Sequence, residues 1–176
     1  MEKKQSVAVN ALTYGLITGA VVIVYSLLMY IANLYMNKWV SSISYLFLLG
    51  GMVWGTLEYR KKAGNGFITY GQAFTSSFII GMIAGVLVTI YSFIFIQYIN
   101  PGMINEIIEQ ARVQMQDKNL TEDQIEAALD MTRKFTTPGL MTVFGLGAYA
   151  LVSAILGLIA AIFLKKLDPN APTSAL

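Results

Sequence analysis

Four long apolar segments alternate with shorter polar segments along this chain. They cover residues 11–32, 39–57, 74–98 and 140–164, and none of them contains a charged residue. Each is close to or longer than the ~20 residues that a helix needs to cross the ~30 Å hydrocarbon core of a bilayer. We therefore predict an all-α membrane protein, a four-helix transmembrane bundle that forms a single membrane domain over residues 1–176.

The pattern within each segment favours helices over the strands of a membrane barrel. Apolar residues run on continuously, whereas barrel strands alternate between apolar and polar positions. Composition agrees, because 56% of the residues are hydrophobic and only 12% are charged, about half the charged share of soluble domains. Lys3 and Lys4 resemble the start of a secretory signal. The apolar run that follows is longer than the ~7–15 residues of a signal, so we interpret it as a retained first span.

Basic residues predict the orientation, since Lys and Arg in short loops stay on the cytoplasmic side. With four spans, one side of the membrane carries seven basic residues in short segments, and the other carries five, mostly within a longer loop. We therefore expect both termini in the cytoplasm of a multi-pass protein. The seven are Lys3, Lys4, Arg60, Lys61, Lys62, Lys165 and Lys166, and the five are Lys38, Arg112, Lys118, Arg133 and Lys134.

The polar segment 100–137 predicts a hairpin of two amphipathic helices on the outer side. Asn100 is expected to cap a first helix that begins at Pro101. Thr121 and Gln124 have the spacing of a capping box at the start of the second helix. The apolar faces of the two helices would pack on each other and on the bundle, dock a partner protein, or lie on the lipid surface. Because the hairpin has seven acidic and four basic residues, the lipid alternative is disfavoured.

The remaining polar segments are short. Thr137 and Pro138 are expected to be the cap and first residue of the fourth span, and the tail at 168–176 is expected to be disordered. In the inner loop, Arg60, Lys61 and Lys62 follow the second span directly. They are interpreted as topology determinants or, alternatively, as ligands for anionic lipid headgroups, at about 1 kcal/mol each. Gly64-Asn65-Gly66 after them predicts a turn.

The sequence offers no residues for catalysis or for binding a cofactor or a metal. It contains no cysteine and no histidine, and its net charge of +2 is too small to indicate nucleic-acid binding. Proton- or ion-coupled transport normally uses an ionisable residue within a span, and the four segments have none. Hydroxyl and amide side chains in the third span are the candidates for lining a pore: Thr75, Ser76, Thr89, Ser92 and Gln97.

Small residues recur four positions apart in every span. This spacing is typical of helices that pack closely in lipid, where no hydrophobic driving force brings them together. It predicts a packed bundle, a homo-oligomer, or both. The helix-packing candidates are Gly15, Gly19, Gly51, Gly55, Ser77, Gly81, Gly85, Ser153 and Gly157.

Three motifs resemble a known family. They are YGLITG at residues 14–19, GFITYGQAF at 66–74 and LTEDQIEAAL at 120–129. Together they resemble the bacterial domain-of-unknown-function family 4199, a group of small four-span inner-membrane proteins. The resemblance implies a location in the bacterial inner membrane, and it implies no activity, ligand or catalytic residue.

These patterns together favour a protein embedded in the lipid bilayer that is not an enzyme. We expect a structural or accessory component that interacts with itself or with other membrane proteins through its helix faces and outer hairpin. The alternative is a small transporter or channel whose pathway is lined by the third-span hydroxyls.

Overall fold

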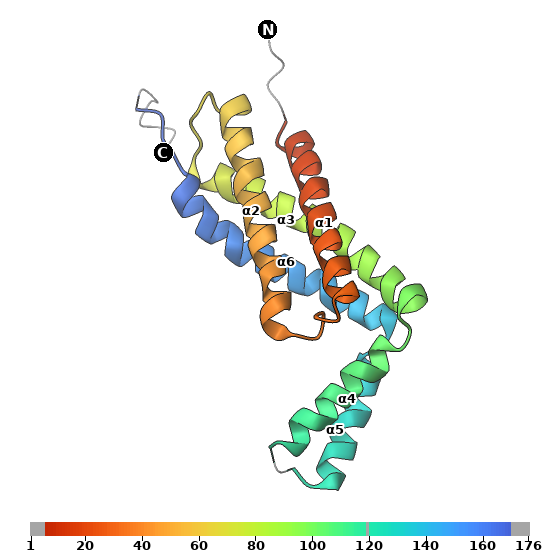
Figure 1. Cartoon of the computed structure of the whole chain (residues 1–176). Coiled ribbons are helices and arrows are strands. Elements are labelled where there is room, and N and C mark those ends of the chain that lie inside the picture. Colours follow the sequence, from red (N-terminus) through yellow and green to blue (C-terminus); the bar gives the residue numbers. More distant parts are fainter. Residues whose placement is uncertain (1–5, 119, 170–176) are drawn as a thin grey trace. The chain divides into compact units, whose positions relative to one another are not determined.

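The structure is a computed structural model that describes residues 6–118 and 120–169, and it consists of helices joined by short connections (Figure 1). Within this described part there is no strand beyond a single isolated bridge. The predicted disordered tail lies outside the described residues except for positions 168 and 169. The elements are α1 (Val7–Ile31), α2 (Lys38–Ala63), α3 (Tyr70–Ile94), the π-helix η1 (Phe95–Ile99), α4 (Met103–Gln116), α5 (Glu122–Phe135) and α6 (Pro138–Leu164).

Four of these helices are long and apolar enough to cross a membrane. They are Val7–Ile31, Trp39–Ala63, Tyr70–Ile99 and Pro138–Leu164; the last three contain their predicted spans, and the first ends one residue before the predicted end at 32. The fold is therefore that of an all-α, multi-pass membrane protein, as the sequence predicted.

Each spanning helix begins a few residues before its predicted span, because a polar residue caps it. Ser6 Oγ accepts a hydrogen bond from Ala8 N at 3.3 Å, and Asn37 Oδ1 accepts one from Trp39 N at 3.0 Å. Thr137 Oγ1 accepts one from Leu140 N at 3.4 Å, which confirms the predicted start of α6. Hydropathy follows the apolar part of a helix, whereas the cap determines where the helix starts.

The start of the outer hairpin differs from the prediction. Asn100 does not cap a helix at Pro101; α4 begins two residues later, at Met103, with Gly102 as its N-cap. The reason is that the backbone of Asn100 ends the preceding helix, since Asn100 N donates to Phe95 O at 2.8 Å. The chain then turns, and Met103 N donates to Asn100 O at 3.1 Å.

The chain divides into two compact units, which we describe separately. Residues 1–88 and 147–176 form the first, called the helix bundle here, and residues 89–146 form the second, called the hairpin unit. The single membrane domain expected over 1–176 stays a prediction.

Two clusters of buried apolar side chains hold the helix bundle together. One joins the first third of α1 to the middle of α2 and α3, and the other joins the start of α3 to the end of α6. Burying these side chains against each other lets the helices pack closely without any charged residue between them. The first cluster is Ala11, Tyr14, Leu48, Met52, Ile80 and Ala84, and the second is Ile68, Ala73, Ala160, Ala161 and Leu164.

The hairpin unit has a smaller core of its own. α4 and α5 lie side by side (Figure 1), and Ile125 and Leu129 of α5 are 2% and 0% exposed. The predicted capping box of Thr121 and Gln124 starts α5 and is confirmed, with Thr121 N donating to Gln124 Oε1 at 3.1 Å. The apolar face predicted for the second hairpin helix is therefore the buried one.

Candidate functional site

The two predicted packing glycines of α1 lie against α3. A Cβ added at Gly15 would be 2.7 Å from Ile83 Cβ, and one added at Gly19 would be 3.3 Å from Ala84 Cα. Both glycines belong to the motif at 14–19. Within that motif the buried positions are Tyr14, Gly15, Thr18 and Gly19.

The two predicted packing glycines of α2 lie against α1. Gly51 faces the side chain of Thr18, and a Cβ at Gly55 would be 2.6 Å from Tyr14 Cβ. Helices α1 and α2 therefore approach each other at two successive turns where α2 has no side chain.

The small residues of α3 and α6 face each other or α2. Gly81 lies against Ser153, and a Cβ at Gly85 would be 2.7 Å from Tyr149 Cβ. Gly157 faces the ring of Phe74 at 3.4 Å, while Ser77 Oγ is 2.9 Å from Thr56 Oγ1 of α2. All nine predicted small residues thus lie at contacts between helices of this chain. Their small size lets the helices of the bundle itself approach closely.

The predicted pore-lining side chains of α3 do not share one environment. Ser76 is fully buried and its Oγ accepts a hydrogen bond from Thr56 Oγ1 at 3.2 Å. Thr89 is 4% exposed, and its Oγ1 has no hydrogen-bond partner among the described residues. Thr75 is exposed, as is Gln97 in η1, and Ser92 is half-buried. These groups are therefore divided between the interior and the outer surface.

Two buried polar residues were not singled out from the sequence. Thr56 of α2 is 0% exposed and is the hydroxyl that joins Ser76 and Ser77. Asn10 of α1 is also 0% exposed, and its Nδ2 donates to Gly55 O at 2.9 Å. The only signal in the sequence is a single polar residue in or beside an apolar run, and this pattern does not indicate which helix supplies the partner.

The motif at 66–74 forms the connection into α3 and holds it against the end of α6. Ile68 and Lys166 exchange two backbone hydrogen bonds, of 2.8 and 2.9 Å. Thr69 and Gln72 form a capping box that the sequence analysis missed, with Thr69 N donating to Gln72 Oε1 at 3.1 Å and Gln72 N to Thr69 Oγ1 at 3.3 Å. The predicted turn before the motif is confirmed, since Asn65 has a φ of 49°.

The basic residues at the end of α2 have local partners. Arg60 Nη1 donates to Leu164 O at 3.1 Å, so its guanidinium satisfies a carbonyl at the C-terminus of α6. Lys61 Nζ lies 2.8 Å and Lys62 Nζ 3.9 Å from the carboxylate oxygens of Glu58. The sequence predicted these three cations beside a membrane surface. The tertiary structure shows in addition that Arg60 links α2 to α6.

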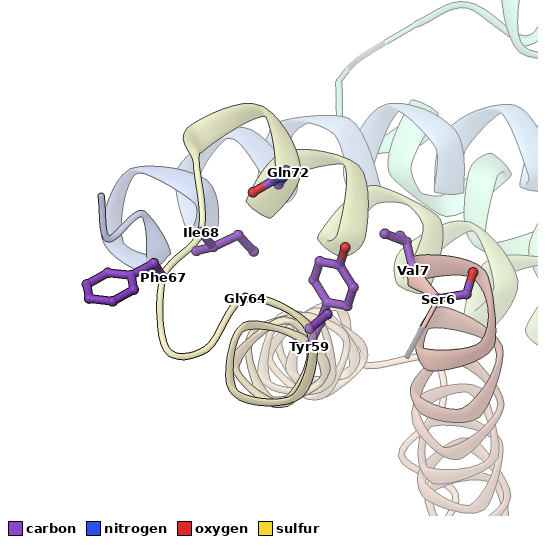
Figure 2. A pocket seen from close by; sticks show the side chains of 8 residues that line it. Ser6, Val7, Tyr59, Gly64, Phe67, Ile68 and Gln72 are labelled. Carbon is purple, nitrogen blue, oxygen red and sulfur yellow. The ribbon is translucent and has the colours of Figure 1, made fainter. Parts of the chain in front are cut away.

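A cavity of about 170 Å³ lies at the same end of the bundle, where α1 and α3 begin and α2 ends (Figure 2). Hydroxyl, phenol and amide side chains contribute to its lining together with apolar ones. Tyr59 reaches across from α2 toward α3 in Figure 2. The lining residues are Ser6, Val7, Tyr59, Ala63, Gly64, Phe67, Ile68 and Gln72.

The hairpin unit exposes apolar side chains that its own core does not use. Met131 is 64% exposed and Phe135 is 53% exposed, although the Phe135 ring lies 6.1 Å from the Phe144 ring. Ala127, four residues before Met131, is also exposed. Residues spaced by four share one face of a helix, so α5 has an apolar stripe outside its buried face. We call Ala127, Met131 and Phe135 the α5 stripe.

Comparison with known proteins identifies the family and nothing finer. Within the residues that the structure describes, no group of three or more His, Cys, Asp or Glu side chains could hold a metal ion. No curated protein and no solved structure matches the chain. One family, described as "Protein of unknown function (DUF4199)", matches residues 13–166. Because this match covers most of the chain and includes all three motifs, the protein belongs to the DUF4199 family.

Proposed function

We propose that this protein is a non-enzymatic accessory component of the bacterial inner membrane that binds another membrane protein, or a second copy of itself. The observation that carries the proposal is the α5 stripe. Met131 is 64% exposed and Phe135 is 53% exposed, although both belong to a unit with its own buried core. Large apolar side chains that stay exposed together on a folded unit are typical of binding surfaces.

The helix faces of the bundle give less support for an interface. The small residues that would allow a second copy to approach closely already face other helices of the same chain. What remains on the outside of the bundle is a set of large apolar side chains, such as Leu151 at 68% and Phe163 at 80% exposed. Lipid covers such surfaces without a specific partner. The hairpin unit is therefore the preferred contact surface.

The charge of the hairpin supports a basic partner. Residues 100–137 contain four basic and seven acidic residues, so their net charge is −3. Asp123, Glu126 and Asp130 of α5 are exposed, and Asp130 adjoins Met131. An apolar stripe beside carboxylates complements a basic amphipathic segment, because opposite potentials guide association and fix the register.

The transporter alternative rests on third-span hydroxyls and has weaker support. Ser76 and Ser77 are engaged with Thr56 across the α2–α3 contact. Thr75 and Gln97 are on the outer surface. A pathway would require these groups to face a common space, so the accessory role is preferred.

Photo-crosslinking in living cells tests the accessory role. A photoreactive phenylalanine analogue in place of Met131 is expected to give a discrete protein adduct after illumination, and the same analogue in place of Gln110, an exposed α4 residue, is expected to give none. Met131→Asp combined with Phe135→Asp should abolish co-purification of the crosslinked protein, because charge replaces the apolar contact. A band of twice the chain's mass would identify self-association. The absence of any protein adduct at position 131 would reject the proposal.

A further inference from the structure

Tertiary structure gathers basic residues from two distant parts of the chain at one end of the helix bundle. Arg60, at the end of α2, is bound to the last residue of α6, Leu164, at 3.1 Å. The two lysines that follow Leu164 are therefore held beside the last turn of α2, and Lys166 is fixed there by its backbone bridge to Ile68. The described basic residues at this end are Arg60, Lys61, Lys62, Lys165 and Lys166, which we call the basic end.

Carboxylates balance the basic end only in part. Its described acidic residues are Glu58, which pairs with Lys61 and Lys62, and Asp168, two positions after Lys166. Five cations against these two carboxylates leave a net charge of +3. Such a concentration of positive charge next to a membrane surface attracts anions.

Arg60 also has a donor that the fold leaves unused. Its Nη1 is bonded to Leu164 O, but its Nε is buried and has no hydrogen-bond acceptor among the described residues. Buried donors in folded proteins are normally satisfied, and a guanidinium pairs most strongly with a carboxylate or a phosphate. The Nε of Arg60 is therefore available to an acceptor from outside the described part of the chain.

The cavity provides space for such a group at the same end of the bundle, and its wall includes sequence neighbours of the basic residues, not the basic residues themselves. Gly64 and Ala63 of its wall follow Lys62 in sequence, and Ile68 is the residue bridged to Lys166. Lys166 Nζ lies 5.5 Å from the centre of the ring of Phe67, a lining residue whose ring points away from the cavity in Figure 2. The Tyr59 hydroxyl and the Gln72 amide add polar groups to the lining (Figure 2). The cavity volume of about 170 Å³ is sufficient for a phosphate group.

We propose that the basic end and its cavity bind an anionic phosphate group, carried by a phospholipid of the adjacent leaflet. The cavity lies where spanning helices begin and end, which is the depth of the headgroups. A lipid could thus place its phosphate beside Arg60 while its acyl chains follow the apolar helix surfaces. This site is independent of the proposed partner-binding surface on α5.

Lipid titration of the purified full-length protein in neutral detergent tests the site. Phosphatidylglycerol is expected to raise the unfolding temperature with increasing concentration, because a ligand that binds the folded state stabilises it. Zwitterionic phosphatidylcholine is expected to give no comparable rise. A parallel titration with inorganic phosphate distinguishes a lipid headgroup from a soluble phosphate as the ligand. A rise in unfolding temperature with phosphatidylglycerol alone indicates a lipid site. A rise with inorganic phosphate alone indicates a soluble phosphate and overturns the lipid assignment.

Two variants should change the affinity for phosphatidylglycerol in opposite directions. Lys61→Gln with Lys62→Gln is expected to weaken phosphatidylglycerol binding at least about tenfold, since a basic residue near an anionic surface contributes ~1 kcal/mol. Glu58→Gln is expected to tighten binding several-fold, because it removes the carboxylate paired with both lysines. Arg133→Gln with Lys134→Gln, the matched basic pair in the last turn of α5, should leave the affinity unchanged.

The role of the cavity itself is tested by Tyr59→Phe, which keeps the ring and removes only the hydroxyl. We expect a loss of about fivefold in affinity, the effect of one hydrogen bond of ~1 kcal/mol. Unchanged binding in Tyr59→Phe, with weaker binding in the double lysine variant, would place the phosphate on the surface and overturn the cavity as its site. Equal stabilisation by both lipids, or equal weakening by the two basic-pair variants, would overturn the proposal altogether.

Discussion

Gly55 of α2 lies where two other helices leave no space for a side chain. A Cβ at this position would be 2.6 Å from Tyr14 Cβ in α1 and 2.6 Å from Ile80 Cδ1 in α3. Tyr14 Cβ is attached directly to the α1 backbone, so relief requires the helices to separate. We predict that Gly55→Leu lowers the free energy of unfolding by about 1–3 kcal/mol or more, measured as a lower thermal midpoint in detergent.

Gly50 provides the matched control, since it is in the same helix and a Cβ there would meet no atom within 4 Å. Gly50→Leu is expected to leave the midpoint nearly unchanged. Similar losses in the two variants would mean that α2 does not pack against α1 and α3 in this way.

At the scale of elements, the family motifs are the places where helices start or meet. The motif at 14–19 supplies the α1 residues that pack on α2 and α3. The motif at 120–129 contains the capping box of α5 and its buried residues. The motif at 66–74 does both, because it caps α3 and bridges Ile68 to Lys166. These roles explain the motifs by packing and capping.

The capping box of α3 gives a prediction at this scale. Thr69→Ala removes the hydroxyl that accepts a hydrogen bond from Gln72 N at 3.3 Å, which typically costs about 1 kcal/mol. We expect amide hydrogen exchange about fivefold faster at the start of α3. Lys166 N, which donates to Ile68 O at 2.9 Å, should exchange faster as well. Thr75→Ala, at an exposed position of the same helix, should change neither exchange rate. Unchanged protection of Lys166 N in both variants would show that the capping box of α3 does not support the bridge between Ile68 and Lys166.

We predict the membrane orientation of the whole molecule from its basic residues. The chain contains no cysteine, so single cysteines can be introduced at exposed positions. Lys118→Cys, after α4, is expected to react with a membrane-impermeant thiol reagent in intact cells, and Asp168→Cys, after α6, only after lysis. The physical reason is that short loops rich in Lys and Arg stay in the cytoplasm, and the segment after α6 is on the side where these residues are in excess. The reverse labelling pattern would invert the topology and place the α5 stripe in the cytoplasm.

The sequence by itself determined the features that depend on local physics. Charge-free runs long enough to cross a bilayer predicted the four spans. Neighbouring residues predicted the capping box of Thr121 and Gln124, the start of α6 at Pro138 and the turn at Asn65. The same reasoning failed at Asn100, where a suitable cap residue ends the preceding helix. Asn100 is suited both to cap the following helix and to end the preceding one, and the spacing of residues did not decide between these two roles.

Only the tertiary structure decided which residues meet across the bundle. Periodic small residues showed that the helices pack closely, but not that Gly55 faces α1 or that Gly81 faces Ser153. The bond from Arg60 to Leu164 joins residues 104 positions apart. Apolar helices in lipid can pack against any neighbour, because no hydrophobic driving force selects one pairing. The choice is made by the fit of side chains and by a few polar groups, and these depend on all the helices together.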